Sequence, residues 1–406
     1  MIDLRAARAD PESFRAALAR KGAADVFDDL LAADARWREL VPQVDELRGR
    51  QKLQGKPTPE QVEELKRVKE DLRRLETELA EAEAARDELL RRVPNPPHES
   101  VPEGDTEEDA QEVRRVGEPP HIEAPKEHTE LARFEMDRAA KLSGSRFGIW
   151  VGASALVALA LYRLALDRLV EKGFTPVLPP VLVREEAMYG TGWFPTEASN
   201  SYGLSDDDLF LVGTAEVPLG GMHADEIFDL DALPIRYSGF STCFRREAGA
   251  AGKDTRGMFR VHQFNKVEQF SYVRPEESWD EHERLLANTE EIVQELELPY
   301  RIVVLPAGDM SAASAKTYDV ELWFPSQGRY RETASVSNTT DYQARRLHIR
   351  YRGEKGPEAV HTLNGTAAVD RMVLALLEVN QREDGSVAVP EALQRYGAPA
   401  EITPGT

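Results

Sequence analysis

Two stretches of heptad spacing stand out in the first hundred residues. Apolar residues recur every seven positions between about residues 28 and 93, first as Trp37 with Val44 and Leu40 with Leu47. The repeat is more persistent in the second stretch, at Leu65, Leu72, Leu79 and at Val68, Leu75, Ala82, Leu89. A seven-residue repeat lines up apolar side chains along one side of a helix. The segment therefore predicts two long helices that pair as an antiparallel coiled coil.

Turn signals separate the two helices. The run 54–59 contains glycine and two prolines, and Thr58, Pro59 and Gln61 fit an N-cap, a first helical residue and the far side of a capping box. Pro42 is expected to interrupt the first helix, because proline lacks the backbone donor. At about 1.5 Å per residue the arm would extend roughly 35 Å. Such a hairpin can also serve as a dimerisation or scaffold element.

A domain boundary is expected near residue 105. Prolines at 94–97 end the second helix, and an acidic linker follows through residue 109. This division gives an N-terminal domain of residues 1–105 and a second domain of residues 106–406. Beyond the linker, a helix is predicted over 129–171, and a β-type run at 173–180 closes with prolines.

The second domain mixes strand-like and helical patterns. The predicted strands are Leu209–Gly213, Val261–Val273 and Tyr300–Leu305, and the predicted helices lie near 276–297 and 367–380. The mixture predicts an α+β fold built on a mostly antiparallel sheet.

Composition narrows the class of protein. With 406 residues and 41% hydrophobic residues, the chain can bury a sizeable core. Its one cysteine, Cys243, excludes a thiolate-cluster zinc site and fits a reducing compartment. The longest apolar run, 147–162, is too short for a bilayer, so we expect a cytoplasmic protein without a membrane partner. The net charge of −21 argues against a protein coated in nucleic acid, so DNA is not expected and any RNA contact must be local.

Candidate chemistry gathers in residues 244–268. Arginines, two separated glutamates and the aromatic Phe264 surround a glycine-rich turn. Guanidinium groups bind phosphates with two hydrogen bonds at once, and carboxylates can receive the amino groups of a purine or a small amine. The segment therefore predicts a nucleotide site.

Several motifs resemble those of the class II aminoacyl-tRNA synthetases, and specifically the seryl-tRNA synthetases. They are the helical hairpin, 177–180 as the first class motif, 244–268 as the second, 362–371 as the third, and the shorter matches 214–216 and 332–335. The resemblance covers nearly the whole chain. It implies the class II antiparallel-sheet catalytic domain with an N-terminal antiparallel two-helix arm.

The resemblance implies that ATP is bound mainly by arginines. Arg245 would hold the α-phosphate, Arg260 and Arg371 the γ-phosphate end, while Glu247 accepts from the adenine amino group and Phe264 stacks on the ring. The implied ATP-binding set is Arg245, Glu247, Arg260, Val261, Phe264, Glu332, Thr333, Ala334, Ser335 and Arg371. Glu332 and Ser335 match the family's metal ligands, whose hard oxygens suit Mg²⁺, and zinc is not expected.

A small hydroxy amino acid needs a carboxylate for its ammonium and polar partners for its hydroxyl. The family places such a pocket at Thr214, Ala215, Glu216, Glu268, Asn364 and Thr366, which implies L-serine as substrate. Serine would attack the α-phosphorus of ATP and then be transferred to the 3′ end of tRNA(Ser), and also of tRNA(Sec). His262 is interpreted as a structural strand residue rather than a general base. Lys253 and Arg256 are candidates for contact with the tRNA acceptor end.

The resemblance implies a homodimer, in which the arm of one subunit binds tRNA held mainly by the other subunit.

Some features of the sequence leave alternatives open. Asp370 beside Arg371 could weaken the phosphate clamp, and Val379 stands after Glu378 where the family commonly has asparagine. The alternatives are a paralogue that makes seryl-adenylate for a carrier protein, a biosynthetic pathway or antibiotic resistance, and a non-catalytic RNA-binding regulator.

Overall fold

The computed structural model describes residues 1–51, 58–249, 252, 254, 257–354 and 356–403. Contacts divide the chain into two compact units, Met1–Pro96 and Pro97–Thr406. The first unit consists of α1 (Leu4–Ala9), α2 (Pro11–Ala19), α3 (Ala24–Arg50) and α4 (Pro59–Arg92). Among the described residues, no helix is both long enough and apolar enough to cross a membrane.

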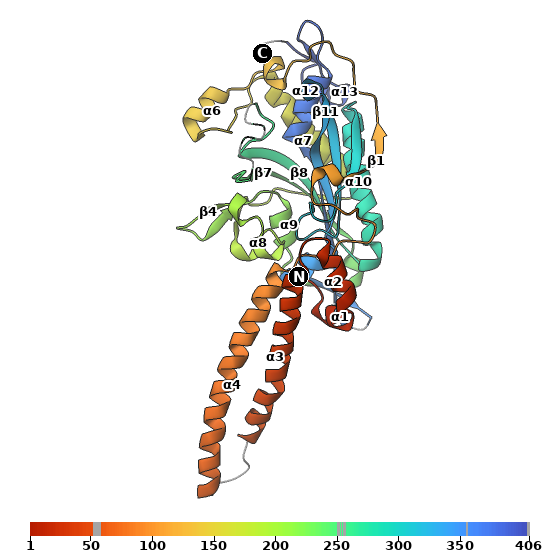
Figure 1. Cartoon of the computed structure of the whole chain (residues 1–406). Coiled ribbons are helices and arrows are strands. Elements are labelled where there is room, and N and C mark those ends of the chain that lie inside the picture. Colours follow the sequence, from red (N-terminus) through yellow and green to blue (C-terminus); the bar gives the residue numbers. More distant parts are fainter. Residues whose placement is uncertain (52–57, 250–251, 253, 255–256, 355, 404–406) are drawn as a thin grey trace. The chain divides into compact units, whose positions relative to one another are not determined.

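Helices α3 and α4 form the predicted antiparallel pair (Figure 1). Leu40, Val44, Val68 and Leu72 of the heptad pattern are buried. Ion pairs flank them, and they join Arg36 to Glu78 at 3.1 Å, Arg48 to Glu76 at 2.9 Å and Arg50 to Glu64 at 3.2 Å. The α4 partner number falls as the α3 number rises, so the antiparallel direction is confirmed.

The sequence made separate predictions for the start of α4, for the turn before it and for Pro42 in α3. The capping box is confirmed, because Gln61 N donates to Thr58 Oγ1 at 3.3 Å and Thr58 N donates to Gln61 Oε1 at 2.8 Å. The turn predicted at 54–57 lies outside the described residues. The predicted interruption at Pro42 is wrong, since α3 runs through it. Proline removes one hydrogen bond, and the buried side chains of Leu40 and Val44 hold the helix on either side of it.

The second unit is built on an eight-stranded sheet in the order β1-β9-β10-β11-β14-β8-β7-β2. These strands are β1 (Gln111–Val116), β2 (Thr175–Val177), β7 (Ile235–Phe244), β8 (Gln263–Val273), β9 (Tyr300–Val304), β10 (Lys316–Phe324), β11 (Arg329–Asn338) and β14 (His361–Val369). Only β2 and β7 pair in parallel within this sheet; the other neighbours are antiparallel. The predicted antiparallel α+β fold is confirmed.

Shorter strands surround the main sheet. They are β3 (Leu182–Arg184), β4 (Tyr202–Leu204), β5 (Leu209–Leu211), β6 (Ile227–Phe228), β12 (Arg350–Gly353), β13 (Gly356–Ala359), β15 (Val387–Ala388) and β16 (Glu401–Ile402). The helices are α5 (His128–Leu131), α6 (Met136–Ser143), α7 (Ala153–Glu171), α8 (Glu185–Gly190), α9 (Glu216–Gly221), α10 (Ser278–Glu295), α11 (Tyr342–Leu347), α12 (Asp370–Val379) and α13 (Glu391–Gln394).

The single helix predicted over 129–171 is wrong. The structure has α5, α6 and α7 instead, with a β-bridge between Phe134 and Trp150 in the interval. Gly144 ends α6 with φ of 96°, and Gly152 precedes α7 with φ of 69°. Both angles lie in the region that favours glycine and breaks a helix.

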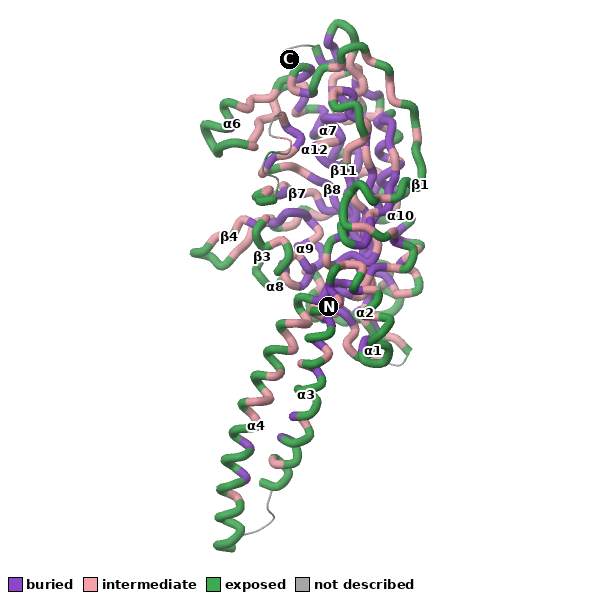
Figure 2. The backbone as a smooth tube through the Cα atoms, in the orientation of Figure 1, coloured by how far each residue is buried: buried purple, intermediate pink, exposed green. Residues whose placement is uncertain are grey.

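One face of the main sheet carries the hydrophobic core. Helices α7, α10 and α12 pack against it, and side chains such as Val267, Val320, Val336 and Leu363 are fully buried there. Figure 2 shows the buried residues concentrated in β8, β11, α7 and α12, whereas most of α3 and α4 is exposed. Successive side chains of a strand point to opposite faces, so the other face of the sheet is free to carry polar groups.

Candidate functional site

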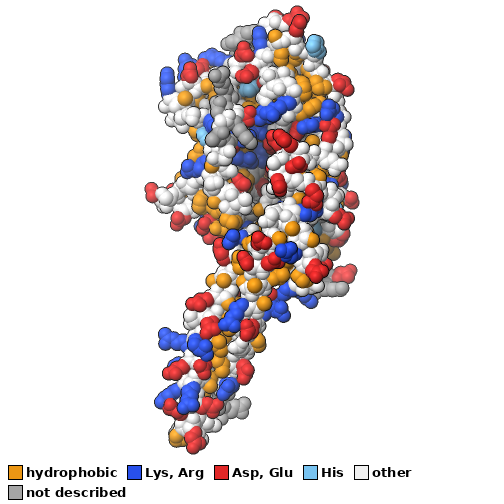
Figure 3. Space-filling view, in the orientation of Figure 1, with side chains coloured by type: hydrophobic (Ala, Val, Ile, Leu, Met, Phe, Trp, Pro, Cys, Tyr) orange, Lys and Arg blue, Asp and Glu red, His pale blue; other side chains and the backbone are white. Residues whose placement is uncertain are grey.

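A cavity of about 530 Å³ lies over the polar face of the sheet. Its lining alternates along each strand with the core residues; it includes Phe264, Lys266 and Glu268 of β8, Thr317, Asp319 and Glu321 of β10, Ser335 and Ser337 of β11, and Asn364 and Thr366 of β14. Figure 3 shows basic side chains inside a hollow of the molecule and acidic side chains at its edge. The period of two along the strands therefore places an apolar core on one face of the sheet and a charged cavity on the other.

A β-bulge brings Glu332 and Ser335 to the same face. Asp319 pairs with Ser335 and Val320 with Ala334, but Glu321 pairs with Glu332, which leaves Thr333 as the extra residue. The Thr333 hydroxyl donates to the Val320 carbonyl at 3.0 Å. In a regular strand, residues three apart point to opposite faces. Here Ser335 Oγ lies 3.4 Å from Glu332 Oε1, and both side chains line the cavity.

The three predicted phosphate-binding arginines line the same cavity. Arg245 Nε donates to the Gly213 carbonyl at 3.3 Å, and its guanidinium lies 5.5 Å from the centre of the Phe264 ring. Arg371 Nε donates to the Phe259 carbonyl at 3.1 Å, and its Nη1 lies 3.3 Å from Glu332 Oε2. Backbone carbonyls thus orient the guanidinium groups of Arg245 and Arg371. A carbonyl oxygen carries no formal charge, so these two contacts do not neutralise the cations.

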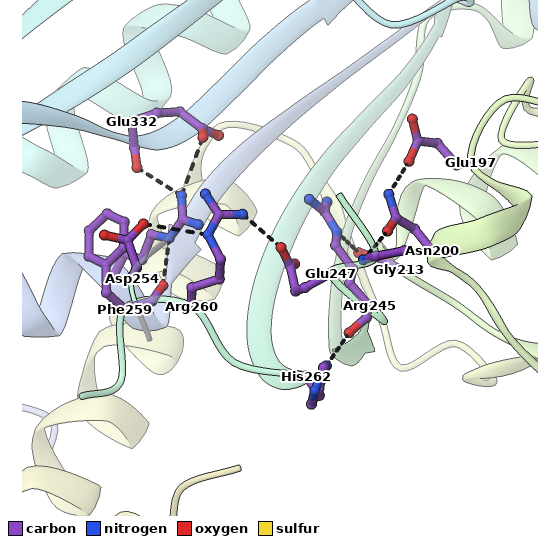
Figure 4. A network of polar contacts seen from close by, with 12 residues as sticks. Glu197, Asn200, Gly213, Arg245, Glu247, Asp254, Phe259, Arg260, His262 and Glu332 are labelled. Carbon is purple, nitrogen blue, oxygen red and sulfur yellow. Dashed lines mark hydrogen bonds and ion pairs between the residues drawn. The ribbon is translucent and has the colours of Figure 1, made fainter. Parts of the chain in front are cut away.

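Acidic side chains hold the remaining cations. Arg260 Nη1 donates to Glu247 Oε2 at 2.7 Å and lies near Asp254, as Figure 4 shows. Arg331 Nη2 also contacts Asp254, at 2.7 Å. The two residues expected to hold opposite ends of ATP, Glu247 and Arg260, are therefore paired with each other. A nucleotide would have to exchange places with these carboxylates.

A second group of polar residues forms one end of the cavity. Lys266 Nζ donates to Thr214 Oγ1 at 2.7 Å and also contacts the Glu268 carboxylate. Asn364 Nδ2 donates to Glu216 Oε1 at 2.9 Å, and Gln343 Nε2 donates to the same oxygen at 2.7 Å. Two carboxylates and one ammonium thus converge, which leaves this end with an excess negative charge suited to a small cation.

The pKa of Glu216 responds to this environment. Burial, and then the charge of Glu268, raise the pKa of Glu216 to about 7. Its protonated form is therefore well populated near neutrality, and a cation bound beside it would favour the ionised form.

Oxygen atoms on β10 and β11 fit Mg²⁺. The Asp319 side chain is almost fully buried beside Ser335, and its Oδ1 has no hydrogen-bond partner in the described part of the chain. Burial and then the Glu332 charge raise the pKa of Asp319 well above its usual range. A cation bound beside this carboxylate would stabilise its ionised form and lower that pKa. Mg²⁺ usually takes one or two protein carboxylates and fills its other positions with water and phosphate. Glu332, Ser335 and Asp319 provide such a donor set.

The remaining residues that the sequence predicted for the site differ in whether their side chains reach the cavity. Val261 and Thr333 line the cavity, whereas the side chains of Ala215 and Ala334 are buried in hydrophobic clusters, so these two can offer only backbone atoms. His262 Nδ1 donates to the Arg245 carbonyl at 2.9 Å, a structural role in the hairpin. Lys253 and Arg256 lie outside the described residues.

The Asp370 carboxylate contacts Tyr162 and the backbone of Asn265, although Asp370 is the sequence neighbour of Arg371. Its carboxylate accepts from the Tyr162 hydroxyl and from the Asn265 backbone N–H at 3.2 Å, and only 3% of the residue is exposed. Burial raises the pKa of Asp370 to about 7. Arg371 is paired with Glu332 instead.

Sequence reasoning missed Lys266, Asp319 and Arg331. The first two alternate with core residues on strands β8 and β10, so the period-two pattern could have assigned them to the cavity face once the core face was known. Arg331 contacts Asp254, which is far away in the sequence, and no local pattern identifies such a pair.

Comparisons with known proteins cover both units. A model of the seryl-tRNA synthetase N-terminal domain matches residues 1–97, and one of the tRNA synthetase class II core domain (G, H, P, S and T) matches residues 201–380. The serine–tRNA ligase of Thermobifida fusca is 49% identical, over 98% of this chain and 97% of the relative.

Solved structures agree with these matches. The seryl-tRNA synthetase of Pyrococcus horikoshii, crystallised with ATP, is 42% identical with a TM-score of 0.94, and the match covers 100% of both chains. The cytoplasmic serine–tRNA ligase of Naegleria fowleri, in complex with AMP, is 32% identical with a TM-score of 0.89, over 98% of this chain and 96% of that one.

Proposed function

The chain belongs to the seryl-tRNA synthetase family, and from that premise we propose how its cavity carries out serine–tRNA ligation. The enzyme activates serine with ATP and passes it to tRNA. The observation that carries the assignment of the site is the convergence of Arg245, Arg260 and Arg371 with the carboxylates of Glu216 and Glu268 in one cavity.

Arginine side chains are proposed to bind ATP. Arg245 contacts the α-phosphate, Arg260 and Arg371 the γ-phosphate end, and the adenine stacks on Phe264 with Glu247 accepting from its amino group. This arrangement is supported by the position of Phe264 beside Arg245 and by the carbonyl contacts that orient Arg245 and Arg371. Glu332, Ser335 and Asp319 would hold Mg²⁺, which when bound neutralises phosphate charge.

The serine pocket is proposed at Thr214, Glu216, Glu268, Asn364 and Thr366. Glu216 receives the ammonium group, and the network of Thr214 and Glu268 hydrogen-bonds the side-chain hydroxyl. A serine carboxylate oxygen attacks the α-phosphorus, the bond to the bridging oxygen of the leaving group breaks, and pyrophosphate departs. Positioning and charge stabilisation supply the rate enhancement, so no protein nucleophile is required.

In the second step the seryl group passes from the adenylate to a hydroxyl at the tRNA 3′ end. We propose tRNA(Ser), and also tRNA(Sec), as acceptors, with α3 and α4 as the tRNA-binding arm. Arg67, Lys69 and Arg73 are exposed on α4 and could contact phosphates. The overall charge of −21 confines such contacts to local surfaces.

A homodimer and a cytoplasmic location complete the proposal. Leu156 and Leu159 of α7 and Leu178 after β2 have 49%, 62% and 80% of their surface exposed, and an apolar surface of this kind suits a second copy of the chain. The single cysteine, Cys243, is buried and fits a reducing compartment.

Aminoacylation of total tRNA with serine, threonine and alanine tests the proposal. We expect serine alone to be attached, and serine-dependent pyrophosphate exchange to be lost in Arg245→Ala. Efficient threonine charging would contradict the pocket. Pyrophosphate exchange without tRNA charging, but with transfer of serine to a carrier protein, would identify a paralogue with another acceptor.

A further inference from the structure

A buried histidine joins the segments that carry the arginines. His128 in α5 has its Nδ1 2.8 Å from Glu378 Oε1, and its Nε2 accepts from the Met258 backbone N–H at 3.1 Å. A backbone N–H can only donate, so Nε2 must be the unprotonated nitrogen. The ring proton therefore lies on Nδ1 and is donated to Glu378. The two contacts fix both the tautomer and the orientation of the ring.

Both partners of His128 lead to the nucleotide site. Met258 precedes Phe259, whose carbonyl accepts from Arg371 Nε at 3.1 Å and whose ring lies 4.5 Å from the Arg371 guanidinium. Glu378 lies two turns after Arg371 in the same helix, α12. The contacts form a closed circuit that runs from α12 through the histidine to residues 258–259 and back to α12.

Two further observations show how tightly this circuit is built. Glu378 Oε2 accepts from Ser326 N at 3.2 Å and from Ser326 Oγ at 2.6 Å, which ties the same carboxylate to the turn between β10 and β11. Gly257 has φ of 70°, and a Cβ atom there would lie 2.8 Å from His128 Nε2. The backbone entering Met258 thus packs directly against the ring.

We propose that His128 is a positioning residue for ATP binding, acting through Met258 and Phe259 on Arg371. Without the acceptor at Nε2, the Met258 N–H would lose its partner in a buried place, and the segment that presents the Phe259 carbonyl would shift. Arg371 would then lose its orientation. The inference rests on the proposed function, because it assumes that Arg371 binds ATP phosphates.

A matched pair of variants separates this role from simple core packing. In His128→Gln the amide oxygen can reach the Nε2 position and accept from Met258, while the contact from Nδ1 to Glu378 is lost. In His128→Asn the amide can occupy the Nδ1 position and donate to Glu378, while Met258 loses its acceptor. Each variant thus removes one of the two side-chain contacts. His121→Gln, at an exposed histidine, is the control.

The measurement is serine-dependent pyrophosphate exchange, with KM determined separately for ATP and serine. KM does not depend on the amount of folded enzyme, so partial loss of protein leaves it interpretable. We expect His128→Asn to raise KM for ATP at least about fivefold, His128→Gln to stay within about twofold, and KM for serine to change little in either. Gly257→Ala, which displaces the ring, should behave like His128→Asn.

Equal KM values for ATP in the Asn and Gln variants would overturn the proposal, as would a parallel rise in the KM for serine. Failure of the proposed function is recognised separately. It would appear as wild-type protein without any serine-dependent exchange, whereas failure of this inference leaves wild-type exchange intact.

Discussion

The elevated pKa of Glu216 predicts that serine binding releases a proton. The serine ammonium group would favour the ionised carboxylate, so binding must expel the proton that Glu216 carries below its pKa of about 7. At about pH 6.5 such a group is roughly three-quarters protonated, and emptying it costs about 0.8 kcal/mol. At about pH 8 almost none of this cost remains. Serine affinity should therefore rise about fourfold between these two values.

Calorimetry with serine alone measures this linkage. Titrations at about pH 6.5 in two buffers of different ionisation enthalpy give the number of protons released, which we expect to be roughly three-quarters of one. Glu216→Gln cannot titrate, so its weaker serine binding should release no proton and lose the dependence on pH. Glu186→Gln, at an exposed position on α8, serves as the control.

Two results would refute the reasoning. Serine affinity that stays flat over this range in the wild-type protein would mean that Glu216 is already ionised or does not meet the ammonium group. Undiminished proton release in Glu216→Gln would assign the proton to another group.

Three further predictions concern side chains of the second unit. Asp254→Asn should lower KM for ATP in pyrophosphate exchange, because Arg260 would then have to leave only the Glu247 carboxylate; an increased KM would contradict this exchange of partners. Leu159→Glu should shift the protein towards monomer in light scattering after gel filtration, whereas an unchanged dimer would exclude α7 from the interface. Asp370 has a raised pKa, so its stabilising contribution is complete below the unfolded value and declines as pH rises through about 7; Asp370→Asn should flatten this part of the profile of melting temperature against pH.

Local patterns in the sequence were enough to predict the arm. The heptads through Leu40, Val44, Val68 and Leu72 predicted its seam, and the capping box at Thr58 predicted where α4 begins. Both signals depend only on neighbouring residues. Pro42 misled because its local cost is outweighed by tertiary packing along the pair of helices.

Predictions for the site came from motifs, and there are physical reasons why the motifs did not predict some of its contacts. The motifs named Arg245, Arg371 and Glu332, which the structure brings to one cavity. They could not show that Glu247 pairs with Arg260, because that contact depends on how the segment between β7 and β8 folds. Gly144 and Gly152 were also overlooked as helix breaks, since the apolar run beside them suggested continuity.

The extra residue at Thr333 makes the spacing of this strand as important as its chemistry. Deleting Thr333 would straighten β11 and rotate the Glu332 carboxylate to the apolar side of the sheet, although Glu332 itself would not have been replaced. In related chains, a gap of one position at this point would therefore signal the loss of the proposed magnesium ligand even where every acidic residue is retained.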